Sequence, residues 1–114
     1  MSIDLTKIVK SKYWMLSWTA NGIDDTTIEY ALKGVPMLVR YVFQRESDNK
    51  SKSEHVHALI ELSAPKDINV IKKCLGPADL IFPAKQFGGA LYSYCTKLTN
   101  CVSGPYYYEK EEKN

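Results

Sequence analysis

The sequence has few of the features that mark membrane, secreted or zinc-ribbon proteins. No apolar run approaches the roughly 20 residues that a membrane-spanning helix needs, and the start of the chain lacks a signal-peptide pattern. The three cysteines, Cys74, Cys95 and Cys101, are an odd number without paired short spacing. Neither a disulfide framework nor a zinc ribbon is therefore expected. These absences predict an intracellular protein in a reducing compartment, with no membrane association.

The net charge is also small, and the chain has few histidines. A net charge of +2 is too small to argue for nucleic acid by itself, although lysines cluster locally, and the chain has only two histidines. With 114 residues and ordinary fractions of apolar and charged residues, residues 1–114 are expected to form one domain with a single modest core. The polar end, 109–114, is expected to fray or to continue into another part of the protein.

Both histidines fall in one short run, at the spacing of a β-strand. Successive side chains of a strand point to opposite faces, so His55 and His57 share one face. The other face is expected to be buried in a core. Its side chains form an unbroken apolar row: Val56, Ala58, Ile60 and Leu62.

A carboxylate is expected beside this histidine pair. Glu46 ends the preceding strand, 37–46, and the polar stretch 47–53 predicts a hairpin loop that returns the chain antiparallel. Pairing of the two strands would bring Glu46 close to His55 and His57. One carboxylate and two imidazoles suit Mn²⁺ or Mg²⁺ with open coordination positions. By itself, an H-x-H pair is more often a pair of surface histidines on a half-buried strand.

The hydrophobic pattern predicts an α+β fold. Strands are expected over 11–19, 37–46, 55–62, 78–82 and 102–108, and helices over about 25–33, 68–75 and 84–98. The resulting β-α-β-β-α-β-α-β order is typical of an RRM-like or ferredoxin-like antiparallel sheet of about five strands. We expect two helices to cover the apolar row and the third to cover the histidine face.

The predicted third helix carries a second group of candidate catalytic residues. Tyr94 and Lys97 are three residues apart, so both project from one helical face. A tyrosinate can attack phosphorus when a metal polarises the phosphate, and Lys97 can stabilise the charge that develops or favour the deprotonated phenol. Tyr92 is the rival nucleophile, but Cys95 stands where its lysine partner would be needed. In isolation, this spacing is also typical of a packed tyrosine and a solvated lysine.

Taken in order, these motifs resemble those of a known family. The chain is similar to the HUH endonuclease (Rep) domain of replication initiators from small circular single-stranded DNA viruses of circovirus, nanovirus and geminivirus type, or related plasmids. The resemblance is carried by Glu46, by His55-Val56-His57, by Tyr94-Cys95-Thr96-Lys97 and by the closing segment 103–108. The first motif departs from the family pattern, because 16–20 lacks both asparagines, and this puts sequence preference in doubt.

The resemblance implies a rolling-circle endonuclease and nucleotidyltransferase. Glu46, His55 and His57 would bind a divalent Mn²⁺ or Mg²⁺ ion, and Tyr94, assisted by Lys97, would nick single-stranded origin DNA at a stem-loop. The product would be a 5′-phosphotyrosine enzyme and a free 3′-OH, and the reverse transfer would rejoin the ends. The family usually carries a helicase domain after this one, through which oligomers form. Location in a host nucleus is implied for a eukaryotic virus, and in the cytoplasm otherwise.

Contacts to DNA are predicted from residue type. Single strands bind to basic grooves and aromatic platforms, which the open sheet face or its rim would supply. The candidates are Trp18, Tyr13, Arg40, Lys52, Lys85 and Tyr92.

Three alternative interpretations remain. The first is a non-catalytic RRM-like module that binds single-stranded nucleic acid, which would need stacking aromatics where His55 and His57 stand. The second is another HUH enzyme, a plasmid relaxase or a transposase; relaxases usually use three histidines, and the transposases pair tyrosine with glutamine. The third is a metal-independent interaction domain, in which the spacing of Tyr94 and Lys97 is coincidence.

Overall fold

The computed structural model describes residues 9–48, 53–76 and 78–111. In that part of the chain, the strands form one antiparallel sheet in the order β4-β1-β3-β2-β5. The predicted α+β class, with a five-stranded antiparallel sheet and three helices, is confirmed for these residues. The elements in chain order are β1 (Lys10–Thr19), α1 (Asp25–Lys33), β2 (Leu38–Ser47), β3 (Glu54–Asp67), α2 (Ile68–Cys74), β4 (Leu80–Ala84), α3 (Gly89–Thr96) and β5 (Cys101–Glu109).

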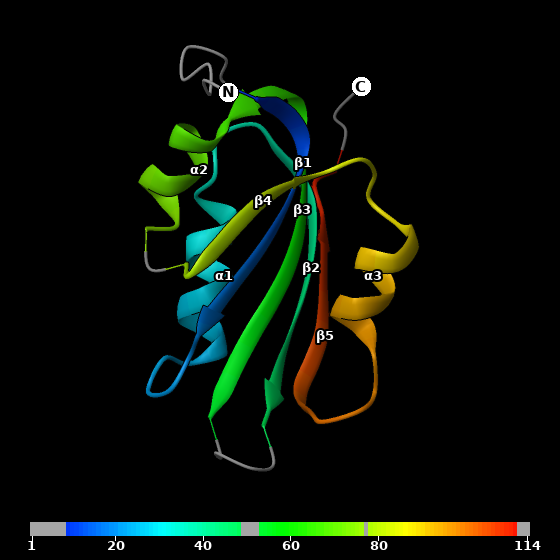
Figure 1. Ribbon diagram of the computed structural model, residues 1–114. Coiled ribbons are helices and arrows are strands. Elements are labelled where there is room, and N and C mark those ends of the chain that lie inside the picture. Colours follow the sequence, from blue (N-terminus) through cyan, green and yellow to red (C-terminus); the bar gives the residue numbers. More distant parts are fainter. Residues whose placement is uncertain (1–8, 49–52, 77, 112–114) are drawn as a thin grey trace, which may run out of the picture.

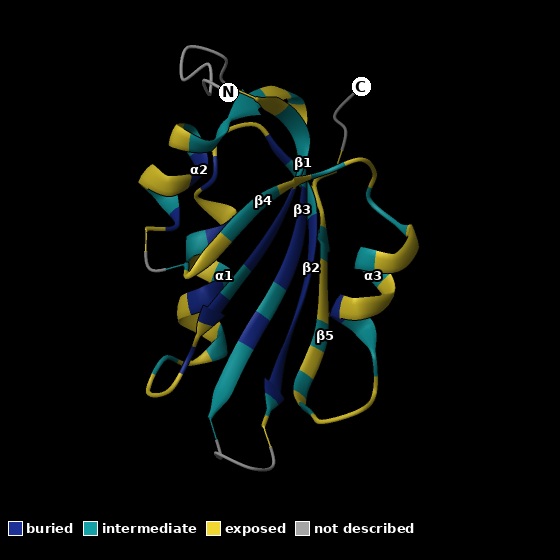
Figure 2. Cartoon of the chain, viewed as in Figure 1, coloured by how far each residue is buried: buried dark blue, intermediate teal, exposed yellow. Residues whose placement is uncertain are grey.

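Helices α1 and α2 cover one face of the sheet, and the larger core lies beneath them (Figure 1). The predicted apolar row of β3 faces these helices, as expected, and each of its side chains is completely buried. Burial is concentrated along β1, β2 and β3, while β5 and α3 are largely exposed (Figure 2). The main members of this core are Trp14, Leu16, Ile28, Leu32, Tyr41, Phe43, Val56, Ala58, Ile60, Leu62, Ile71 and Leu75.

Helix α3 lies on the opposite face, over a smaller core. Cys95 is completely buried there, beside Met15 of β1, Val42 of β2 and Leu59 of β3. Leu91 packs at the edge of the same cluster. Since Leu59 lies two residues after His57 and so points to the same face of β3, α3 covers the histidine face, as predicted. None of the helices in the described ranges is long and apolar enough to cross a membrane.

The third helix is shorter than predicted. It begins at Gly89 rather than near residue 84, because the chain is still in strand β4 up to Ala84. Gly89 has a φ of +66°, a left-handed conformation that favours glycine and interrupts any helix that would continue through it. Strand β4 tolerates Pro83 because it lies at the edge of the sheet, where a missing N–H costs no central ladder bond.

Candidate active site

The pairing of β2 with β3 sets which polar residues share a face. Glu46 stands opposite His55, and Gln44 stands opposite His57. Directly opposite residues of an antiparallel pair point to the same side of the sheet. All four side chains therefore lie on the face that α3 covers, at the end of the sheet where β2 and β3 approach their hairpin.

The Glu46 carboxylate is the centre of this group. Glu46 is only 7% exposed, and three groups contact its carboxylate. His57 Nδ1 lies 2.9 Å from Oε2, and Gln44 Nε2 donates to the same oxygen at 3.2 Å. The Lys97 ammonium lies 3.1 Å from Oε1. Burying a carboxylate is favourable only with such compensation, so these contacts fix its orientation.

Tyr94 closes the group from α3. Its ring stacks on the imidazole of His57, with 4.7 Å between centroids and 25° between planes. The Lys97 ammonium lies 4.1 Å from the centroid of the Tyr94 ring, a cation–π distance. Tyr94 is nevertheless 44% exposed. Residues from β2, β3 and α3 thus place an accessible phenol beside a buried carboxylate, an imidazole and an ammonium group.

His57 is held in its neutral form. Burial lowers the pKa of His57 and outweighs the opposing effect of the Glu46 carboxylate, while the charge of Lys97 lowers it further. In the neutral ring, Nδ1–H donates to Glu46, so Nε2 keeps its lone pair. A histidine that donates one ring N–H to a carboxylate is the usual form of a metal-binding histidine.

The donor set has the chemistry of a divalent-cation site, but the side chains are only partly gathered. A carboxylate with neutral imidazoles suits Mn²⁺ or Mg²⁺. In the part of the chain that the structure describes, no three His, Cys, Asp or Glu side chains come together closely enough to hold a metal ion. His55 therefore does not join Glu46 and His57 in such a group. The position next to Glu46 Oε1 is taken by the Lys97 ammonium.

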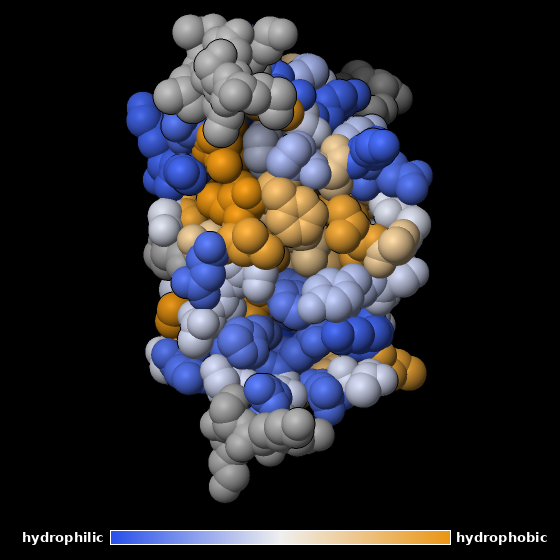
Figure 3. Space-filling model, viewed as in Figure 1, coloured by the Kyte–Doolittle hydropathy of each residue, from blue (hydrophilic) through white to orange (hydrophobic). Residues whose placement is uncertain are grey.

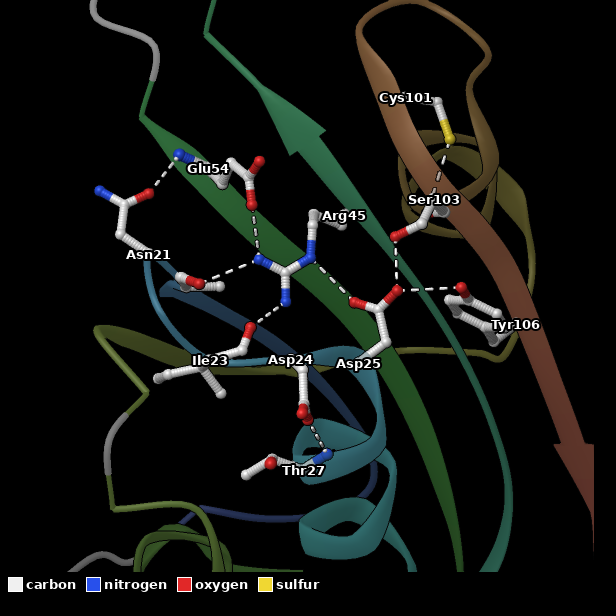
Figure 4. A network of polar contacts seen from close by, with 11 residues as sticks. Asn21, Ile23, Asp24, Asp25, Thr27, Arg45, Glu54, Cys101, Ser103 and Tyr106 are labelled. Atoms are coloured by element: carbon white, nitrogen blue, oxygen red, sulfur yellow. Dashed lines mark hydrogen bonds and ion pairs between the residues drawn. The ribbon is translucent and has the colours of Figure 1, made fainter.

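A second polar network on the other face supports the strand that carries Glu46. Arg45 is 6% exposed and lies among acceptors from four residues (Figure 4). Its guanidinium donates to Asp25 Oδ1 and Glu54 Oε1, each at 2.8 Å, and to the carbonyls of Ala20 and Ile23. Asp25 in turn accepts hydrogen bonds from two side chains of β5. The backbone on which Glu46 stands is thereby tied to α1, β3 and β5.

A hollow with a volume of about 310 Å³ opens beside Tyr94 and His57. Its walls come from β1, β3, β4 and α3 and are mostly apolar, with polar groups from Ser17 and His57. The surface in this view carries a band of apolar side chains bordered by hydrophilic ones (Figure 3). The remaining lining residues are Met15, Leu80, Phe82 and Leu91.

Two of the predicted DNA contacts form an aromatic and basic surface next to α3. The guanidinium of Arg40 lies over the ring of Phe87, 4.2 Å from its centroid, and is paired with Glu61. Tyr92 packs edge-on against Phe87 and near Tyr107. Tyr92 thus has partners of its own, whereas Tyr94 is the tyrosine that contacts His57.

The other predicted contacts have different positions. Tyr13 is half-buried and paired with Glu61, on the same face as Arg40. Lys85 is exposed in the segment before α3, and Lys52 lies outside the described residues. Placing Trp18 on the open face was wrong, because it is 5% exposed and packs in the larger core under α1. Trp18 is four residues after Trp14 on the same strand, so both point to the same face.

The sequence interpretation missed Gln44 and Arg45. Gln44 is two residues before Glu46 on one strand, so period-2 spacing could have placed it on the same face. Arg45 could have been singled out as a charged residue inside an otherwise apolar strand, where burial demands partners.

We compared the sequence with models of protein families and with curated proteins. No model of a protein family matches the chain, and no curated protein matches it at a significant level.

Proposed function

We propose that this protein is a metal-dependent endonuclease that nicks single-stranded DNA through a covalent phosphotyrosine. The observation that carries the proposal is the stack of Tyr94 on His57, with Glu46 and Lys97 in contact with these two residues. A buried carboxylate, a neutral imidazole, an exposed phenol and an ammonium group are the parts that phosphoryl transfer to tyrosine requires.

In the proposed reaction, Tyr94 Oη attacks the phosphorus of the scissile phosphodiester in line with the leaving 3′ oxygen. The phenol loses its proton, the bond from phosphorus to the 3′ oxygen breaks, and that oxygen gains a proton. The products are a 5′-phosphotyrosine and a free 3′-OH. Attack of a later 3′-OH on the phosphotyrosine reverses the step and joins the ends without another energy source.

Each residue has a separate part in this reaction. A divalent ion, when bound, would neutralise phosphate charge and polarise the phosphorus. Glu46 and His57, with His55 brought in from the same face, are the residues that would hold it. Lys97 would then bind a non-bridging phosphate oxygen or favour the phenolate form of Tyr94, and both stabilise negative charge near the attacking oxygen.

The surroundings of Tyr94 suit a single strand better than a duplex. The apolar hollow beside Tyr94 and His57 is large enough for one unstacked nucleobase, whose face would meet Phe82 and Leu91. The surface of Arg40, Phe87 and Tyr92 offers a stacking platform farther along. A stem-loop origin would present its loop or flanking strand to this face.

The proposal extends to the family that the motifs resemble and to its role in replication. The sheet order β4-β1-β3-β2, extended by β5, is compatible with a ferredoxin-like arrangement, and the motifs resemble those of HUH Rep domains. The resemblance supports a proposed role in rolling-circle replication. The host nucleus would be its location for a eukaryotic virus, and the cytoplasm otherwise.

Replacement of the nucleophile tests the proposal. The wild-type protein, incubated with Mn²⁺ and end-labelled single-stranded oligonucleotides from a randomised library, should give a covalent adduct on a denaturing gel. Tyr94→Phe should abolish the adduct, because it removes only the attacking oxygen and keeps the stack on His57. Tyr92→Phe is the matched control on the same helix and should retain it.

The possible results separate the alternatives. An adduct that persists in Tyr94→Phe and disappears in Tyr92→Phe would transfer the role to Tyr92. Binding of the oligonucleotides without any adduct would identify a non-catalytic single-strand-binding module instead.

A further inference from the structure

We infer that Gln44 is a positioning residue of the candidate site, one that holds the Glu46 carboxylate and the end of the tyrosine-bearing helix in fixed relation to each other. Its catalytic consequence rests on the proposed function, but its structural consequence does not. Gln44 is completely buried, on the strand that carries Glu46.

The side-chain amide of Gln44 connects two elements. Its Nε2 donates to Glu46 Oε2 at 3.2 Å and to the backbone carbonyl of Lys97 at 2.8 Å. Lys97 is the C-cap of α3, and carbonyls at a helix C-terminus have no donor within the helix. Gln44 therefore supplies a missing hydrogen bond at the end of α3, three residues after Tyr94.

The orientation of this amide is determined by its partners. Both groups next to Nε2 are acceptors, so a flipped amide would place its oxygen against a carboxylate and a carbonyl. In the observed orientation, Gln44 Oε1 is the one buried side-chain nitrogen or oxygen atom of the described residues that has no hydrogen-bond partner. An unsatisfied buried acceptor lowers stability, which an apolar side chain here would avoid. The glutamine is thus a poor choice for packing and a good one for orienting acceptors.

Strand β5 passes close to the backbone and Cβ of the same residue. Gly104 has a φ of +95°, and a Cβ on it would lie 3.1 Å from Gln44 Cβ and 3.1 Å from the carbonyl oxygen of Phe43. The absence of a side chain at Gly104 lets β5 pass directly over Gln44. Gln44 is therefore enclosed by β5 on one side and bonded to α3 on the other.

Besides the ion pair of Lys97 with Glu46 and the stack of Tyr94 on His57, helix α3 is held in place by apolar packing. It has eight residues, begins at a pair of glycines and lacks a side-chain N-cap. Helices of this length are not stable by themselves, so tertiary contacts determine where they lie. Packing of Cys95 and Leu91 supplies apolar contact, which is non-directional, whereas the Gln44 hydrogen bond sets the position of the helix end along the strand. The distance between Tyr94 and His57 depends on that position.

Substitution by leucine, which has a similar volume without a donor, tests the assignment. In Gln44→Leu we expect adduct formation to slow about tenfold or more while the KM for the oligonucleotide stays within about twofold, because groups are misaligned in the transition state and binding is retained. We also expect Mn²⁺ binding, followed by electron paramagnetic resonance, to weaken, and hydrogen exchange of the α3 amides to accelerate. Asn69→Leu, which replaces an exposed amide on α2 at the opposite face of the sheet, is the matched control and should leave all four quantities unchanged.

The results of this experiment are distinguishable from failure of the proposed function. If the wild-type protein forms no adduct, the proposed function fails, yet faster α3 exchange in Gln44→Leu would still support the positioning role. If Gln44→Leu forms the adduct at the wild-type rate, or leaves both Mn²⁺ binding and α3 exchange unchanged, the inference is overturned. Should the leucine variant not fold, Gln44→Met, which keeps the unbranched shape, is read in the same way.

Discussion

The ammonium group of Lys97 lies where a cation would be expected to meet Glu46. It is 3.1 Å from Oε1, and its side chain is 36% exposed, so it can move into solvent without being buried elsewhere. A divalent ion at the same carboxylate would compete with this ion pair. In the proposed reaction, Lys97 would exchange its pairing with Glu46 for a position near the phosphate and the phenol of Tyr94.

This competition predicts the effect of removing the ammonium group. Lys97→Met should bind Mn²⁺ up to about fivefold more tightly, because a partly exposed ion pair of at most about 1 kcal/mol no longer opposes the ion. The same variant should form the phosphotyrosine adduct more slowly. Isothermal titration with Mn²⁺ measures the affinity, with Lys85→Met as the control for loss of one positive charge. Weaker binding by Lys97→Met would mean that the lysine assists the ion rather than competing with it.

At the scale of single residues, the sequence predicted which face of the sheet a residue lies on better than which side chains it contacts. Alternation along a strand places Glu46, His55 and His57 on one face whatever the details of packing, and this was correct. It could not reveal that Glu46 contacts His57 and Lys97 while His55 stays outside the group, because such contacts depend on side-chain rotamers and on the position of α3. Trp18 was placed wrongly because an aromatic residue in a strand can pack in the core as readily as it can stack on a ligand.

At the scale of elements, Arg45 and Asp25 join the start of α1 to three strands. Burial by itself would raise the pKa of Asp25, but hydrogen bonds from Ser103, Arg45 and Tyr106 outweigh it and hold the pKa below its ordinary value. Because the folded-state pKa is the lower one, the stabilisation is complete above about pH 4, the pKa in the unfolded chain, and is lost as the pH falls through the folded-state pKa.

Asp25→Asn should therefore lower the free energy of unfolding at pH 7 by roughly 1.5–3 kcal/mol, the value of hydrogen bonds to a charged group. The difference from wild type should begin to shrink as the pH falls below about 4, where the unfolded chain takes up a proton, and should be smallest once the pH is below the lowered folded-state pKa and the native carboxylate is protonated too. Urea unfolding at several pH values measures this. Glu111→Gln, at an exposed carboxylate outside the network, should differ little from wild type throughout. A constant difference between Asp25→Asn and wild type at all pH values would show that the charge of Asp25 is irrelevant.

Element boundaries illustrate where local sequence information ends. The side chains of Asp24 and Asp67 cap α1 and α2, and such acceptors for free N–H groups are a local signal in the sequence. The start of α3 was placed about five residues too early. The residues up to Ala84 are held in β4 by pairing with β1, a contact between distant parts of the chain that local periodicity does not report.

At the scale of the whole molecule, the two faces of the sheet carry different kinds of side chain. The face under α1 and α2 holds most of the buried aromatic and aliphatic side chains, whereas the face under α3 holds the polar group around Glu46 and the apolar hollow beside Tyr94. If this division is correct, single-stranded DNA should cross the α3 face and leave the α1 and α2 face free. Exposed lysines occur near both faces: Lys85 just before α3, and Lys73 on α2.

These two lysines give a matched test of the DNA path. Neutralising one phosphate contact on a single strand changes the slope of log affinity against log salt concentration by roughly 0.7. Lys85→Ala should therefore flatten the slope by about that amount and weaken binding at low salt, because the proposed path of the DNA runs past the ammonium group of Lys85. Lys73→Ala, which removes the same charge from the opposite side, should leave the slope unchanged. Fluorescence anisotropy with a labelled oligonucleotide at several salt concentrations measures both, and the reverse pattern would place the DNA across α1 and α2, away from Tyr94.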